Sequence, residues 1–71
     1  MKLHYYPETD SLYIELNAMA GGEVHEIAAG LNADLASDGT VVGIDIDHAS
    51  QRIDLSTLET SALPHPVLKA A

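Results

Sequence analysis

The stretch NADLASDGTVVGIDIDH, residues 32–48, decides the fold of this chain, because alternating apolar residues flank Asp38 and Gly39 on both sides. Asp-Gly between alternating runs is the strongest short-range signal of a β-hairpin. With this dipeptide at the tip, the apolar pairs are Leu35 with Val42, Ala33 with Ile44, and Leu31 with Ile46. The polar pairs are Asp34 with Gly43 and Asn32 with Asp45. One face is therefore apolar and the other polar, and a slip of one residue would mix the two.

A second hairpin is predicted at the N-terminus, where LHYY and SLYIEL flank the turn residues PETD. A turn centred on Glu8 and Thr9 pairs Tyr5 with Leu12, Leu3 with Ile14, His4 with Tyr13, and Lys2 with Glu15. Apolar residues then face each other, and the one charged pair has opposite signs. Cross-strand pairs of this kind stabilise a hairpin.

Between the hairpins, EVHEIAAG (residues 23–30) indicates a further strand with broken alternation. Val24 and Ile27 are three residues apart, which a bulge or an interruption near Glu26 would explain. The chain is therefore expected to be mainly β, with α+β as the alternative. We expect an antiparallel sheet of about five strands in two hairpins, near residues 2–6, 11–17, 23–27, 31–36 and 40–47.

Short helical turns are expected after the sheet. HASQRI (residues 48–53) fits one helical turn with Asp47 as its N-cap, and DLSTLET (residues 54–60) fits a second, because Ser56 and Glu59 have capping-box spacing. Prolines then exclude regular structure. We expect one domain over residues 1–62 and a tail over residues 63–71. The tail is either flexible or docked on a second subunit through Leu63, Val67 and Leu68.

The composition restricts the classes of partner. The chain has 71 residues, no cysteine and a net charge of −8. A basic surface for nucleic-acid phosphates or anionic membranes is missing, whereas a basic protein partner fits the charge. No apolar run is long enough for a transmembrane helix and no secretory signal opens the chain, so a cytoplasmic location is expected.

Small domains without disulfides often gain stability by self-association. The alternation leaves one apolar face that short terminal helices cover only in part; its members are Leu12, Ile14, Leu16, Leu35, Val42, Ile44 and Ile46. An uncovered apolar face of that extent is typical of an interface. A homodimer is therefore expected.

The polar face carries the residues that a functional site would use. Asp34, Asp45 and Asp47 share it, and His48 follows directly. Carboxylates on one face suit Mg²⁺ or Mn²⁺, but this register spreads the acids apart and gives each a water-facing role. The sequence therefore predicts no metal and no cofactor, although these four residues are the metal candidates. Because no activated nucleophile or phosphate loop is recognisable, no enzyme is expected.

Gly43 is unusual because it lies in the middle of a predicted strand. A glycine there marks either a kink that curves the sheet or a close approach of another chain to a bare backbone. The interaction surface is therefore expected to comprise Asp34, Gly43, Asp45 and Asp47.

These stretches resemble a known bacterial family. Tyr5, PETDSLYIEL (residues 7–16) and LNADLASDGTVVGIDIDHAS (residues 31–50) are similar to domain-of-unknown-function family 2283. In place of the acidic residue that members typically carry after the first tyrosine, this chain has Tyr6. The resemblance implies a small, mostly antiparallel sheet with a short helical end, and no established activity.

The resemblance also implies a role to test, since many such short genes lie beside a small toxin-like gene. The expected function is a non-enzymatic protein-interaction module, antitoxin-like, that binds a basic toxin-like partner. The alternative is a small metal- or ligand-binding protein that uses the acidic sheet face.

Overall fold

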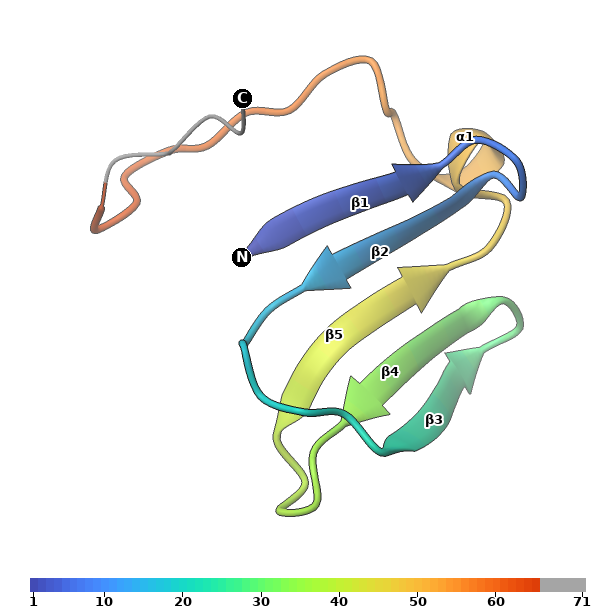
Figure 1. Cartoon of the computed structure of the whole chain (residues 1–71). Coiled ribbons are helices and arrows are strands. Elements are labelled where there is room, and N and C mark those ends of the chain that lie inside the picture. The colour runs from blue at the N-terminus through green and yellow to red at the C-terminus, as the bar shows by residue number, and fades with distance from the viewer. Residues whose placement is uncertain (66–71) are drawn as a thin grey trace.

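The computed structural model describes residues 1–65, which form an antiparallel sheet followed by one helical turn (Figure 1). The elements are β1 (Lys2–Tyr6), β2 (Ser11–Glu15), β3 (Glu23–Ala28), β4 (Leu31–Leu35), β5 (Val41–Ile46) and α1 (Ala49–Arg52). The mainly β prediction is confirmed, and each predicted strand is found within two residues of its expected ends. The predicted tail of residues 63–71, including Val67 and Leu68, lies mostly outside the described residues.

The order of the strands across the sheet is β1-β2-β5-β4-β3. The last strand in the sequence, β5, therefore lies in the middle and joins the two hairpins (Figure 1). It pairs antiparallel with β2 on one side and with β4 on the other. This arrangement leaves β1 and β3 as the two edges of the sheet.

The register of the N-terminal hairpin is the predicted one. Tyr5 lies opposite Leu12, Leu3 opposite Ile14, His4 opposite Tyr13, and Lys2 opposite Glu15. Because side chains alternate along each strand, the aromatic and aliphatic pairs share one face of the sheet.

The hairpin of β4 and β5 is predicted correctly except near its turn. Four pairs, from Leu31 with Ile46 to Asp34 with Gly43, are confirmed, but Leu35 lies opposite Val41 and not Val42. The turn holds three residues, not two, because the Gly39 N–H donates to the Ala36 carbonyl (2.9 Å) and the Ala36 N–H to the Thr40 carbonyl (2.8 Å). Gly39 has the positive φ of 88° that closes such a turn.

A bulge in β5 restores the register beyond this turn. Val42 is the extra residue, and its carbonyl accepts the N–H groups of Leu16 (2.7 Å) and Asn17 (3.1 Å) after β2. The predicted bulge in β3 is also confirmed, because the pairing with β4 shifts between Glu26 and Ala28. Ile27 is therefore the residue that breaks the alternation there.

The helical turn α1 is confirmed, but its predicted cap is wrong. Its N-cap is His48, which has a φ of 52° and makes no side-chain cap bond. Asp10, from the β1–β2 turn, supplies the cap instead. Its carbonyl accepts the Ala49 N–H (2.8 Å), and its carboxylate accepts the Ser50 N–H (3.1 Å) and hydroxyl (2.7 Å).

The second predicted helix, over residues 54–60, does not form. The Asp54 carboxylate accepts the Ser56 N–H (3.0 Å), the Ser56 hydroxyl, and the Thr57 hydroxyl (3.0 Å). Such local bonds compete with a helical backbone and favour an Asx turn.

The core lies where α1 meets the apolar face of the sheet. Leu12, Ile46 and Ala49 are buried together, and Ile14, Leu31, Ile44 and Ile53 pack against them. The rest of this face has no second layer, as Figure 1 shows for the described residues. Residues 1–65 contain no helix with the length and apolar character needed to cross a membrane.

Candidate functional site

The polar face of the sheet is the candidate site, because it holds four of the five carboxylates on the strands and two of the three tyrosines. We use the name polar face for the strand residues that the register places opposite the apolar face. These are Lys2, His4, Tyr6, Ser11, Tyr13, Glu15, Val24, Glu26, Asn32, Asp34, Gly43 and Asp45. Their common side follows from the period of two along each strand.

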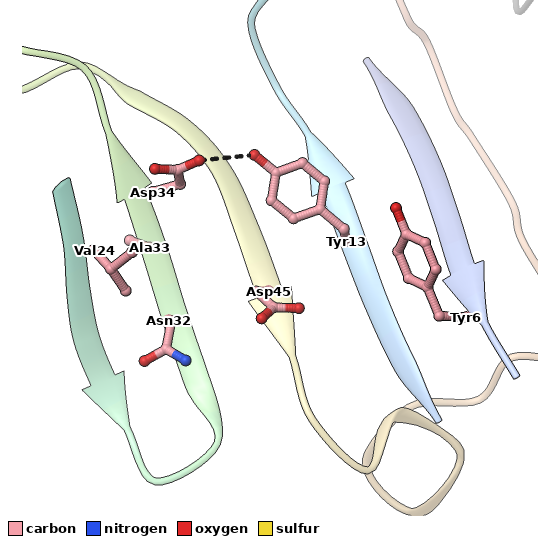
Figure 2. A pocket seen from close by; sticks show the side chains of 7 residues that line it. All are labelled: Tyr6, Tyr13, Val24, Asn32, Ala33, Asp34 and Asp45. Carbon is pink, nitrogen blue, oxygen red and sulfur yellow. Dashed lines mark hydrogen bonds between the residues drawn. The ribbon is translucent and has the colours of Figure 1, made fainter. Parts of the chain in front are cut away.

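A tyrosine crosses the middle of this face. The Tyr13 hydroxyl, from β2, donates to the Asp34 carboxylate of β4 at 3.2 Å, so the ring spans the intervening strand β5 (Figure 2). The strand residue beneath the ring is Gly43, where a methyl group would collide with the phenol oxygen and ring atoms of Tyr13. Glycine at this position therefore permits the Tyr13–Asp34 bond.

Of the two alternatives for Gly43, a kink in the strand or a bare backbone left for another chain, this contact argues against the second. Gly43 is buried, and the close approach comes from Tyr13 of the same sheet. Sequence reasoning missed the contact because it required β2 to pair with β5, which no local signal indicates. The pattern that would have found it is an aromatic residue diagonal to a strand glycine.

The environment of Tyr13 favours its neutral form. Burial raises the pKa of the phenol first, and the hydrogen bond to Asp34 and the negative charges of Asp34, Glu15 and Asp45 raise it further. The phenol therefore keeps its proton at neutral pH and points it at Asp34. Such a group holds a carboxylate in place and is poorly matched to proton transfer, which is fastest when the pKa lies near the working pH.

The loop between β2 and β3 closes the other side of Asp34. A methyl group at Gly21 would collide with both carboxylate oxygens of Asp34, and the neighbouring Gly22 N–H donates to the Leu35 carbonyl at 3.0 Å. The Asp34 carboxylate is thus held between Tyr13 and this loop. The sequence had indicated that Asp34 faces water, but the side chain is half-buried and does not project freely into solvent.

A shallow depression of about 250 Å³ lies beside this pair. Figure 2 shows side chains from all five strands around it; they are Tyr6, Tyr13, Val24, Asn32, Ala33, Asp34 and Asp45. Asp45 lies opposite both Tyr13 and Asn32. The depression therefore combines two phenol rings with two carboxylates, a setting that suits a cationic side chain.

Only part of the predicted site comes together. Asp34, Gly43 and Asp45 share the polar face, with Asp34 diagonal to Asp45 as expected. Asp47 lies beyond β5, where its N–H donates to the Gly30 carbonyl (2.8 Å), and His48 begins the turn into α1. Within residues 1–65, no group of three or more His, Asp or Glu side chains is arranged to hold a metal ion.

A second polar cluster surrounds Asp10 and has a structural role. The Tyr5 hydroxyl donates to the Asp10 carboxylate (2.7 Å), beside the two bonds from Ser50. The bonds from Ser50, and then that from Tyr5, lower the pKa of Asp10, while the same contact raises the pKa of Tyr5. This carboxylate ties the first hairpin to α1, and sequence reasoning gave it only the role of a turn residue.

Comparison with known proteins adds one relationship. The model of the family described as "Protein of unknown function (DUF2283)" matches residues 2–50, from β1 to the start of α1. A search of curated proteins and a search of solved structures found no match. The matched part includes both hairpins and the whole polar face.

Proposed function

Since the chain belongs to the DUF2283 family of proteins of unknown function, we propose its role from its own surface. It is a non-enzymatic interaction module whose polar face binds a basic protein, in the manner of an antitoxin that binds a basic toxin-like partner. The observation that carries this proposal is the Tyr13–Asp34 pair beside the depression.

The charges of the polar face support a basic partner. Its strand residues include the carboxylates of Glu15, Glu26, Asp34 and Asp45, against the single ammonium of Lys2. The register spreads these acids over the face. A distributed negative surface attracts a basic partner from a distance and orients it, which chiefly raises the association rate.

The depression supports a specific anchor within that surface. A lysine or arginine side chain of the partner would lie against the rings of Tyr6 and Tyr13 and pair with Asp45. Asp34 is already held by Tyr13, so little side-chain freedom remains to be lost there on binding. Preorganisation of this kind favours affinity.

The experiment is co-purification of the chain with the product of its neighbouring gene, at low and at high salt. We expect association that weakens as salt rises, because salt screens exposed charges. Asp45→Lys should weaken binding by about tenfold or more, since it reverses a charge at the anchor.

The matched control is Glu8→Lys, which makes the same change in net charge in the β1–β2 turn, away from the depression. It should bind almost as the unmodified chain does. If the pair fails to associate at low salt, or if both variants bind equally well, the proposal is wrong.

A further inference from the structure

The edge strand β1 has no strand paired to its outer side among residues 1–65. All five of its residues are exposed, with fractions of 45% for Leu3, 45% for Tyr5 and 47% for Tyr6. Within residues 1–65 its strand partner is β2 alone, and no backbone hydrogen bond joins β1 to the described segment after α1. Its outer N–H and C=O groups are therefore available to another strand.

The opposite edge is protected. The pairing of β3 is broken by the bulge at Ile27, and Glu23 and Glu26 place negative charges along it. Bulges and charges are the usual means by which an edge strand avoids pairing with another chain. In contrast, β1 has no bulge, no proline and no acid.

We propose that a second copy of this chain pairs antiparallel with β1, around a two-fold axis at His4. The axis sets His4 opposite His4 of the partner subunit, Leu3 opposite Tyr5 of the partner subunit, and Lys2 opposite Tyr6 of the partner subunit. The two sheets then continue as one.

Only this register uses the whole strand. A shift of one residue between the two strands would set residues of opposite faces against each other. A larger shift would leave part of β1 unpaired. In the chosen register the apolar side chains meet on one face, while Lys2 lies next to an aromatic ring on the other. No two acids are opposed, which matters for chains with a net charge of −8.

A second copy also extends an apolar groove. The segment after α1 runs past β1 in both views (Figures 1 and 2) and forms a groove of about 570 Å³ with it. Its apolar lining includes Leu3, Tyr5, Leu55 and Leu58, of which Leu58 is 73% exposed. A two-fold axis perpendicular to the sheet places both grooves on the same side, where their exposed side chains adjoin.

The dimer has a consequence for the polar face. The same axis turns both polar faces to the other side of the continuous sheet, so the two acidic surfaces lie next to each other. The pairing does not depend on the basic partner proposed above, and it is tested on the isolated chain.

The test is disulfide trapping, since the chain has no cysteine. His4→Cys should form an intermolecular disulfide on mild oxidation, because directly opposed residues of antiparallel strands have Cα atoms about 4.5–5.5 Å apart, within disulfide reach. His25→Cys, at an exposed site on β3, is the matched control and should form far less.

Light scattering on the unmodified chain should give twice the chain mass of 7.5 kDa at micromolar concentration. His4→Glu should give the monomer, because it opposes two carboxylates at the axis, while His25→Glu should stay dimeric. Circular dichroism checks that each variant is folded. A monomeric unmodified chain, or a dimer that His4→Cys does not trap, would overturn the proposal.

Discussion

The two ends of the sheet are held in different ways. At the end near α1, the bonds join distant residues: Asp10 binds Ala49 and Ser50, and the Arg52 guanidinium donates to the Ala29 carbonyl. At the other end, the turn between β4 and β5 is closed by bonds within residues 36–40, including one from the Thr40 N–H to the Asp38 carboxylate (2.9 Å). The end near α1 is therefore held by contacts that form only in the assembled fold. The β4–β5 turn is closed by hydrogen bonds among its own residues.

This difference explains why one helical turn is stable in so small a protein. A four-residue helix cannot persist alone, because nucleation costs more than its few bonds return. Here α1 contacts both the β1–β2 turn, through Asp10, and the β3–β4 turn, through Arg52. It therefore acts as a clamp between these two turns, and its loss should affect the whole sheet.

The largest expected effect is at the core beneath this clamp. Leu12→Ala should lower the free energy of unfolding by about 2–5 kcal/mol, because it removes a buried side chain that packs on Ala49 and Ile46. Val24→Ala, on an exposed side chain of β3, is the control and should change it by less than about 0.5 kcal/mol. Chemical denaturation measures both, and equal losses would contradict the location of the core.

The next largest effect is expected at Gly43, where the Tyr13 ring of β2 covers β5. Gly43→Ala should cost about 1–3 kcal/mol, because the added methyl group displaces the Tyr13 ring and breaks its bond to Asp34. Gly22→Ala is the matched control, since open space surrounds that glycine. Thermal denaturation compares the two; if Gly43→Ala is as mild as Gly22→Ala, Tyr13 does not cover β5 in solution.

A smaller effect is expected in the locally closed turn. Gly39→Ala should cost about 1–2 kcal/mol, because alanine is strained at a φ of 88°. The strain is confined to residues 36–40, so the unfolding transition should keep its steepness in denaturant. A change in that slope would show that this turn is coupled to the rest of the sheet more widely than its bonds indicate.

The smallest expected effect is on stability at acidic pH, and it depends on the Asp10 carboxylate. Hydrogen bonds from Ser50 and Tyr5 hold the pKa of Asp10 below its ordinary value of 3.8. A carboxyl with a lowered pKa stabilises the fold above its unfolded pKa, and this stabilisation is lost as the pH falls below about 4 through the folded value. Solvent screens an exposed site, so the loss should be modest.

Asp10→Asn should therefore reduce the loss of thermal stability between neutral pH and acid. Ser50→Ala, which removes the main cause of the shift, should act in the same direction. Asp38 and Asp54 also have lowered pKa values, so part of the acid sensitivity should remain in both variants. An unchanged acid profile in Asp10→Asn would exclude this carboxylate as a contributor.

Local signals predicted much of the fold and part of the site. Alternation and turn residues located the strands, the first hairpin register and the bulge of β3. The errors arose where local bonds competed: a three-residue turn replaced the expected tip, and Asp54 formed an Asx turn in place of a helix. For the site, the shared face of Asp34 and Asp45 was predictable, whereas the partners of both Asp34 and Asp10 were not.

The sequence by itself determined which residues form strands, which side each residue faces, and that one face is acidic, because alternation with a period of two is a local property. Only the tertiary structure decided that β5 pairs with β2 and so lies in the middle of the sheet. From that placement follow the Tyr13 ring over Gly43, and Asp10 as the cap of α1. The reason is physical: these contacts join residues that only the packed sheet brings together.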